Sequence, residues 1–276
     1  MIDLHCHILP GLDDGAKDLE EALEMARIAQ KDGIEKIVAT PHLFREDYRY
    51  EDFGKVRDKL ERLNRLLRKN KIDVEILLGA EVHISHDLVE KVRKNREMLV
   101  LNGSSYMFVE FPSDHIFRDV KNLFFELMSE GIIPIIAHPE RNSVFTHNPS
   151  ILFDLIQMGA LAQGNSGSFH GLYGDHARES LANFLAWNLI HFIASDGHNT
   201  RLVSPRLSEA LKTAVSLIGE AKAKALVRDN PKAVLDDREL PYLDNPVDPK
   251  SMEKTFKIKI PSLFRKKGNS GLTKKT

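Results

Sequence analysis

Cysteine, tryptophan and long apolar runs are scarce in this chain of 276 residues. Its one cysteine, Cys6, excludes structural disulfides within the chain and a cysteine-rich zinc site. No run approaches the roughly 18 apolar residues that a membrane-spanning helix needs, which excludes an integral membrane protein of that kind. The first residues also lack the basic region and apolar stretch of a secretory signal peptide. The sequence therefore predicts a cytoplasmic protein.

The chain as a whole also lacks an excess of positive or negative charge, but its C-terminal end is strongly basic. The chain has 39 Lys and Arg against 40 Asp and Glu, yet residues 251–276 hold eight Lys or Arg and one acidic residue, Glu253. The rest of the chain is therefore acidic, which disfavours nucleic-acid binding. The basic end interleaves cationic and apolar side chains, which favours weak contact with an anionic membrane from the cytoplasmic side. A solvated tail without that role is the alternative.

Strand and helix patterns alternate along the chain. Helical spacing of apolar residues predicts helices over 18–33 and 56–67 and a short one over 87–94. Apolar or β-branched runs predict seven strands, over 2–7, 36–42, 74–82, 106–111, 133–138, 160–165 and 190–196. This alternation indicates an α/β protein whose parallel strands form a closed or nearly closed (β/α)7 barrel. A doubly wound open sheet is the alternative.

Periodicity fades near the C-terminus. After residue 229 the pattern gives way to Pro241, Pro246 and Pro249, which mark the end of the folded part. The sequence predicts one domain over residues 1–248 and a basic, flexible tail over 249–276.

Residue types that bind metals follow six of the seven predicted strands. The carboxyl ends of barrel strands meet at one face, where active sites are built. Because side chains alternate along a strand, His5 and His7 face one side and Cys6 the other. A lone histidine at such a position is more often a structural residue, but a whole set converging without a cation would be costly. The set comprises His5, His7, Asp13, Asp14, His42, Glu81, Glu110, His138, Asp196 and His198.

The donor atoms indicate the kind of cation. Imidazole and carboxylate without thiolate suit manganese, iron or zinc, and several carboxylates able to bridge favour a cluster of more than one ion. From spacing alone the sequence predicts a multinuclear metal-dependent hydrolase.

These residues also carry a family resemblance. The chain resembles the polymerase and histidinol phosphatase (PHP) superfamily and, more narrowly, the manganese-dependent tyrosine-protein phosphatases of bacterial capsule and exopolysaccharide loci. The matching motifs run in order through residues 1–10, 13–15, 39–42, 109–112, 136–142, 164–168 and 194–199. They include His5-Cys6-His7, Asp13-Asp14-Gly15 and Ser195-Asp196-Gly197-His198. The family fold implied is a distorted seven-stranded barrel.

The resemblance implies three divalent ions and their ligands. His5, His7 and Asp196 would bind the first, and Glu81 would bridge it to a second completed by Glu110 and His138. A third would take Asp14, His42 and His198. The seven other histidines lie outside the matching positions: His83, His86, His115, His147, His170, His176 and His191.

Arginine is the expected partner of the phosphoryl oxygens, because a planar guanidinium binds phosphate bidentately. The resemblance places Arg141 in this role, and a surface ion pair with Glu140 is the alternative. The family also has an Arg about five residues after the last ligand histidine. That position is Val203 here, which leaves Arg201 or Arg206 as the residue implied.

The resemblance implies hydrolysis of phosphotyrosine by a metal-bridged hydroxide, on the tail of a bacterial tyrosine kinase that controls polysaccharide synthesis. Two alternatives remain open: a PHP-type phosphoesterase acting on histidinol phosphate or on nucleic-acid ends, and a non-catalytic, metal-stabilised scaffold. Cys6 is expected to be a bystander, since a cysteine phosphatase needs an Arg six positions on and Leu12 stands there.

Overall fold

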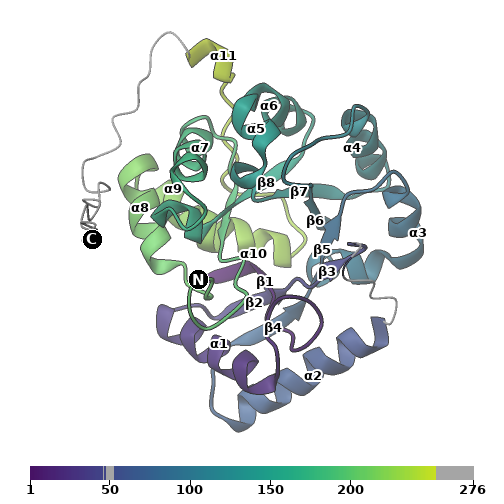
Figure 1. The fold of residues 1–276 in the computed structure, drawn as a ribbon, viewed down its shortest axis with the longest axis vertical. Coiled ribbons are helices and arrows are strands. Elements are labelled where there is room, and N and C mark those ends of the chain that lie inside the picture. The colour runs from purple at the N-terminus through teal and green to yellow at the C-terminus, as the bar shows by residue number, and fades with distance from the viewer. Residues whose placement is uncertain (46, 48–52, 253–276) are drawn as a thin grey trace, which may run out of the picture.

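Two parallel sheets carry the strands of this protein. The computed structural model describes residues 1–45, 47 and 53–252 (Figure 1). One sheet has the order β1 (Ile2–Cys6), β2 (Lys36–Ala39) and β4 (Glu75–Leu78). The other has the order β3 (His42–Leu43), β5 (Glu81–His83), β6 (Tyr106–Glu110), β7 (Ile133–Ala137), β8 (Leu161–Asn165) and β9 (Phe192–Ala194).

The two sheets are parts of one ring. The predicted strand 36–42 is divided into β2 and β3 at Pro41, which cannot donate to a ladder, and 74–82 is divided into β4 and β5. At the other junction the amide of Asp196 donates to the carbonyl of His5 at 2.8 Å, and the amide of His7 donates to that of Gly197 at 2.8 Å. The predicted distorted barrel is therefore confirmed, and the open-sheet alternative is wrong.

Helices cover the outside of the ring (Figure 1). The predicted helix 18–33 is α1 (Leu19–Asp32), where the Asp18 side chain accepts from the Glu21 amide and Gly33 ends the helix at φ 85°. The helix predicted over 56–67 is α2 (Phe53–Lys69) and that over 87–94 is α3 (Leu88–Leu99). The others are α4 (Val120–Ser129), α5 (Ser143–His147), α6 (Pro149–Gln157), α7 (Asp175–Ala186), α8 (Ser208–Ile218), α9 (Glu220–Lys224), α10 (Asn230–Leu235) and α11 (Pro249–Met252). Three short 3-10 helices are η1 (Leu101–Gly103), η2 (Pro139–Arg141) and η3 (Ser166–His170), and a π-helix is η4 (Ala225–Asp229).

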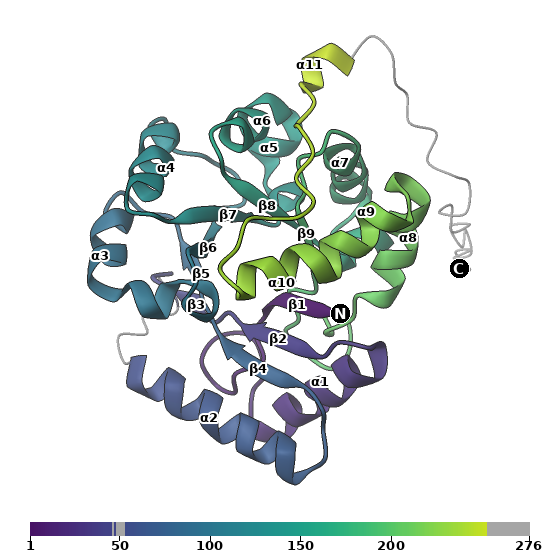
Figure 2. The same cartoon turned by 180° about the vertical axis from the view of Figure 1, so that it is seen from behind.

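The amino ends of the strands are closed by the segment around α10. Val234 is buried in the same apolar cluster as Leu4, Phe108 and Ile135, which project into the barrel, and Leu240 packs against it. Figure 2 shows α10 lying across the back of the molecule beside β1. With this end filled by apolar side chains, the carboxyl ends of the strands remain for a polar site.

Residues 236–248 pack on the barrel although they form no helix or strand. The Val247 amide donates to the Trp187 carbonyl at 2.9 Å, and Lys222 Nζ lies 2.7 Å from Asp244 Oδ2. The predicted tail begins with α11, and the remainder, residues 253–276, lies outside the described residues.

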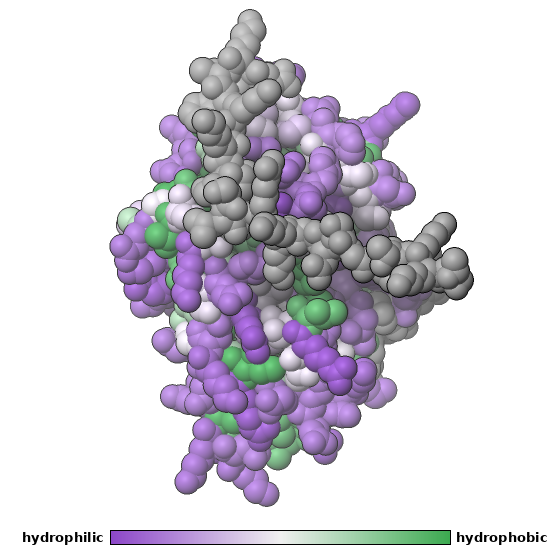
Figure 3. All heavy atoms as spheres, turned by 60° about the vertical axis from the view of Figure 1, so that its left-hand side comes forward, coloured by the Kyte–Doolittle hydropathy of each residue, from purple (hydrophilic) through white to green (hydrophobic). Residues whose placement is uncertain are grey.

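Apolar residues on the face seen in Figure 3 form small, separate patches in a polar surface. None of the helices among the described residues has the length and apolarity needed to cross a membrane.

Candidate metal centre

His5 lies on β1 and is fully buried among polar partners. Its Nδ1 donates to Gln163 Oε1 at 3.0 Å, and Gln163 Nε2 donates to Asn165 Oδ1 at 2.7 Å. Asn165 Nδ2 donates in turn to Asp196 Oδ2 at 2.7 Å. These contacts fix the orientation of the His5 ring and turn Nε2 toward the cluster, as the outer partners of metal-binding histidines do.

His7 is held in the same way by a carboxylate. Its Nδ1 donates to Asp13 Oδ2 at 2.7 Å, and this oxygen also accepts from the backbone amide of His42 at 3.0 Å. Asp13 Oδ1 accepts from the Gly15 amide at 3.0 Å. Asp13 is therefore a positioning residue that aims His7 Nε2 at the cluster and ties the first loop to β3.

Glu81 lies at the centre of the cluster and is completely buried. Its Oε2 is 3.3 Å from His5 Nε2, 3.4 Å from His7 Nε2 and 3.0 Å from His42 Nδ1, while Oε1 is 2.9 Å from His138 Nε2. Oε2 accepts no hydrogen bond of good geometry from the described residues. A buried carboxylate oxygen that several imidazole nitrogens surround in this way fits a bridging metal ligand.

Asp196 faces the same nitrogens from the end of β9. Its Oδ1 lies 3.4 Å from Nε2 of both His5 and His7. On the other side of Glu81, Glu110 Oε2 is 3.5 Å from His42 Nδ1. Both carboxylates are buried, so they complete a group of ionisable side chains that water does not solvate.

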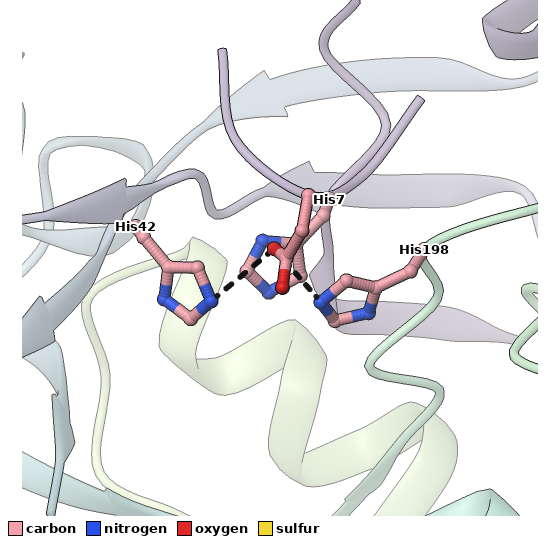
Figure 4. Close-up of side chains that lie close together, drawn as sticks. His7, His42 and His198 are labelled. Carbon is pink, nitrogen blue, oxygen red and sulfur yellow. Dashed lines mark ion pairs between the residues drawn. The ribbon is translucent and has the colours of Figure 1, made fainter. Parts of the chain in front are cut away.

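Asp14 closes the open side of the cluster. Its Oδ1 is 3.4 Å from His198 Nε2 and 3.5 Å from His42 Nε2. His198 Nδ1 donates to the Asp196 carbonyl at 2.7 Å, which turns Nε2 toward Asp14. Figure 4 shows the rings of His7, His42 and His198 gathered around this point, with the ion pairs dashed.

All nine predicted ligands thus meet at the carboxyl ends of the strands. Three groups place one ligand atom from each member within 4.8 Å of one another, namely His5, His7, Glu81 and Asp196; His42, Glu81 and Glu110; and His7, Asp14, His42 and His198. The first is the set implied for one ion. The second has His42 where His138 was expected, although His138 lies against the other oxygen of Glu81. The third includes His7 in addition.

Two of these ligand positions are strained. His138 has φ 32° and Asp196 has φ 52°, both in the left-handed region that side chains with a Cβ seldom adopt. Each follows a strand end, after β7 and β9 respectively. Strain at two positions that project into one cluster favours a functional rather than a structural reason for the conformation.

The buried carboxylates and histidines of the cluster stabilise one another's charged forms. Burial would lower the pKa of His7, but the Asp13 carboxylate holds this pKa well above its ordinary value. Burial would raise the pKa of Glu81 and of Asp196, yet His5 above all holds both well below their usual range. Ionised carboxylates buried among imidazoles are what divalent cations stabilise, so the residues fit a metal cluster.

Arg141 lines the pocket above the cluster. The pocket has a volume of about 280 Å³ and includes Asp14, His42, Arg45, Glu81, His83, Glu110, His138, Arg141, Asp196 and His198. Arg141 Nη1 donates to Asp196 Oδ2 at 2.6 Å, and its guanidinium lies 4.3 Å from the centre of the Tyr173 ring. The Glu140 alternative is wrong, because Glu140 is buried and accepts from Ser168 Oγ at 2.7 Å instead.

The structure does not bring the other two predicted arginines into this pocket. Arg201 lines a neighbouring hollow that shares Asp14 and His198 with it. Arg206 lines two hollows farther along the surface, both of which also include Glu209 and neither of which includes any of the nine proposed ligands.

Several residues that act on the cluster escaped the sequence interpretation. Gln163 and Asn165 lie at alternate positions of β8, a spacing that places both on one face and signals a polar purpose in a buried strand. His83 lies outside the matching positions, but it ends β5, and its Nδ1 is 3.2 Å from Glu110 Oε2. Arg45 follows β3 and had no signal of its own, because its role depends on how the chain folds.

Cys6 faces away from the ligands, as its place in the strand predicts. It is buried, its Sγ donates to the Gly197 carbonyl at 3.4 Å, and burial raises the pKa of the thiol well above its usual value. A neutral, buried thiol without access to the pocket is no nucleophile.

Comparison with known proteins gives the family. The profile described as "Capsular polysaccharide synthesis, CpsB/CapC" matches residues 1–236. The chain belongs to the CpsB/CapC family. Its relatives within that family include "Tyrosine-protein phosphatase YwqE" of Bacillus subtilis (strain 168), 43% identical over 211 residues, which are 76% of this chain and 82% of the relative.

Other CpsB/CapC relatives extend the match. "Putative tyrosine-protein phosphatase CapC" of Staphylococcus aureus is 41% identical over 199 residues, 72% of this chain and 77% of the relative. "Tyrosine-protein phosphatase CpsB" of Streptococcus agalactiae is 31% identical over 246 residues, 85% of this chain and 98% of the relative.

Solved structures agree on the fold. A structure from a study of YwqE from Bacillus subtilis and CpsB from Streptococcus pneumoniae, titled "unique metal-dependent tyrosine phosphatases", has a TM-score of 0.85 at 38% identity and covers 90% of this chain and 99% of that one. Histidinol phosphate phosphatase from Lactococcus lactis has a TM-score of 0.51 at 14% identity, covering 78% and 92%. The latter shows a common fold alone.

Proposed function

We propose that this CpsB/CapC chain is a metal-dependent protein-tyrosine phosphatase. The observation that carries the proposal is the convergence of eight imidazole and carboxylate side chains around buried Glu81, beneath a pocket that Arg141 lines. Relatives 31% to 43% identical are named as tyrosine-protein phosphatases, which supports the substrate class. A cluster of this kind beside a guanidinium suits a phosphate monoester.

The ligand set that we propose is His5, His7, Asp14, His42, Glu81, Glu110, His138, Asp196 and His198, holding three divalent ions. Manganese suits the mixed imidazole and carboxylate donors, with iron or zinc as the alternatives. When bound, such ions supply activation of water and neutralisation of charge on the phosphoryl oxygens.

The chain's own contribution is binding and orientation. Asp196 and the Tyr173 ring hold the Arg141 guanidinium over the pocket, where it would bind two phosphoryl oxygens. Because phenol titrates near ~10, a tyrosine phenolate is a better leaving group than an alkoxide, and the site needs little help from a general acid. Arg201, at the edge of the site, and Arg206 stay open as further phosphate-binding residues.

The partner that we propose is the phosphotyrosine-containing tail of a bacterial tyrosine kinase of capsule or exopolysaccharide synthesis. The CpsB/CapC family takes its description from capsular polysaccharide synthesis. We place the chain in the cytoplasm and propose that residues 253–276, rich in Lys and Arg, contact the anionic inner face of the membrane weakly. Residues 1–248 would form the catalytic domain.

The test compares substrates with and without metal. The chain, stripped with a chelator and then supplied with Mn²⁺, should release phosphate from a phosphotyrosyl peptide far faster than from histidinol phosphate or a 5′-phosphorylated oligonucleotide. Preference for either of the latter substrates would replace the proposal with another PHP-type activity. No metal-dependent turnover of any of the three would favour the non-catalytic scaffold.

A further inference from the structure

The described cationic side chains that line the metal-centre pocket are two, Arg141 and Arg45. They come from different parts of the barrel: Arg141 lies in η2 after β7, whereas Arg45 follows β3. In the sheet order β3 and β7 are separated by β5 and β6, so the two guanidiniums enter the pocket from separate positions on its rim. A phosphomonoester carries about two negative charges and three acceptor oxygens, more than one guanidinium satisfies.

The two arginines are held differently. Arg141 Nη1 is 2.6 Å from Asp196 Oδ2 and its guanidinium is stacked on Tyr173. Arg45 Nη1 is 3.4 Å from Glu110 Oε1, longer than an ordinary charge-assisted hydrogen bond, and 3.0 Å from His42 Nε2. Glu110 therefore holds Arg45 less tightly than Asp196 holds Arg141, so exchange of that contact for a phosphate costs less.

Arg45 also competes for a ligand atom. His42 Nε2, which lies 3.0 Å from Arg45 Nη1, is 3.5 Å from Asp14 Oδ1 in the group around His198. A nitrogen that accepts a hydrogen bond from a guanidinium has no lone pair left for a cation. Binding of a metal ion by that nitrogen would therefore require Arg45 to turn to another partner.

We propose that Arg45 is a second phosphate-binding residue, which transfers from His42 and Glu110 to the phosphoryl oxygens of the substrate. The inference rests on the proposed function, since it concerns the same pocket and substrate. Arg45 and Arg141 then donate hydrogen bonds to the phosphoryl oxygens from two sides. Arg201 and Arg206 do not line this pocket.

Calorimetric titration of inorganic phosphate into the Mn²⁺-loaded full chain tests this directly. Arg45→Ala should bind phosphate roughly 10- to 100-fold more weakly, as expected for loss of a hydrogen bond to a charged group. Arg45→Lys should recover part of the affinity, because it keeps the charge but not the planar fork. Arg62→Ala, on the exposed side of α2, is the matched control and should bind as the wild type does.

Metal content and steady-state kinetics separate the outcomes. Metal analysis of each variant should show wild-type stoichiometry, and the KM for a phosphotyrosyl peptide should rise in Arg45→Ala. Unchanged phosphate affinity in a folded Arg45→Ala chain, or weak binding that merely follows lost metal, would overturn the inference. Failure of the proposed function has a different signature, because the wild type itself would then not hydrolyse the peptide although its phosphate affinity still depended on Arg45.

Discussion

At the scale of single residues, the candidate metal centre depends on the residues that orient its histidines as much as on the proposed ligands. Asp13 and Gln163 orient the rings of His7 and His5 through hydrogen bonds of 2.7 Å and 3.0 Å. Position along the strands therefore predicts which ionisable side chains meet in the cluster better than it predicts the residues that orient them. Most of the proposed ligands lie at or just after the ends of predicted strands, whereas Gln163 contacts His5 only because β8 lies two places from β1 around the ring. That neighbourhood is a property of the closed barrel, which local patterns do not give.

Arg141→Ala should separate phosphate binding from metal binding. We expect metal content to be unchanged, because Asp196 Oδ2 still accepts from Asn165 Nδ2 at 2.7 Å. We expect a loss of about 2–4 kcal/mol of transition-state stabilisation, as for removal of one oxyanion-stabilising donor. The ratio of kcat/KM for a phosphotyrosyl peptide, wild type to variant, measures it. Normal turnover by the variant would remove Arg141 from the site.

His191 gives the protein a pH-dependent stability outside the metal centre. It is buried, and burial, with a smaller effect of Lys222, lowers its pKa to about 4. In the unfolded chain the pKa of His191 has the ordinary histidine value of about 6.5. Between about pH 4 and pH 6.5 the unfolded chain therefore binds a proton at His191 that the folded chain does not bind. This difference in proton binding has no effect on stability at pH 7.5, and it destabilises the folded state progressively as the pH falls toward 4.

We expect the free energy of unfolding to fall by about 2 kcal/mol more in the wild type than in His191→Gln between pH 7.5 and pH 5. Urea unfolding in the presence of a chelator measures this without contributions from bound metal. An equal fall in both chains would mean that His191 titrates normally when folded.

At the scale of elements, the loop between β1 and α1 decides how Asp13 and Asp14 reach the cluster. A Cβ at Gly15 would lie 2.0 Å from the carbonyl oxygen of His7, which is backbone and must shift to admit it. The Ala16 amide donates to that same oxygen at 3.0 Å, so the loop is closed on itself. Glycine is therefore required at position 15 of the motif Asp13-Asp14-Gly15, because any larger residue would clash with the backbone of His7.

Gly15→Ala should therefore reduce the metal content together with the activity. We expect a loss of stability of roughly 1–3 kcal/mol from overpacking and a displaced pair of carboxylates. Gly103→Ala is the control, since Gly103 has φ 72° and open space around it, far along the chain from the centre. This control should lose stability but keep its metal, as measured by metal analysis and thermal unfolding. Full metal content in Gly15→Ala would show that the loop tolerates the added methyl group.

At the scale of the whole molecule, the sequence predicts the barrel well and its breaks poorly. Alternation of strands and helices gives seven strands, but the interruptions at Pro41 and Gly79 appear only when neighbouring ladders are in place. A Cβ at Gly79 would lie 2.5 Å from Val38 Cγ1. Val38 is on a neighbouring strand and far from Gly79 in the sequence, so the pattern around Gly79 alone does not reveal this close contact. The fading pattern after residue 229 likewise concealed α10, which closes the barrel.

The boundary at residue 248 makes a prediction for the whole chain. A chain ending at Asp248 should hydrolyse a small aryl phosphate as fast as the full-length protein, because all nine proposed ligands and Arg141 lie within residues 5–198. Of the described fold it lacks only α11, a short helix that packs against α6 on the outside of the barrel. It should lose salt-sensitive sedimentation with phosphatidylserine vesicles, since each Lys or Arg near such a surface contributes about 1 kcal/mol. Equal sedimentation of both chains, or none by either, would leave residues 249–276 without a membrane role.

We propose above all that Glu81 and the eight ionisable side chains around it hold catalytic divalent ions. An anomalous difference map at the manganese edge, from crystals grown with Mn²⁺, tests it most directly. The account predicts peaks on both sides of Glu81, within coordination distance of its oxygens and of the surrounding imidazoles. A well-ordered chain with no anomalous peak in this pocket, under conditions in which the protein hydrolyses phosphotyrosine, would contradict it.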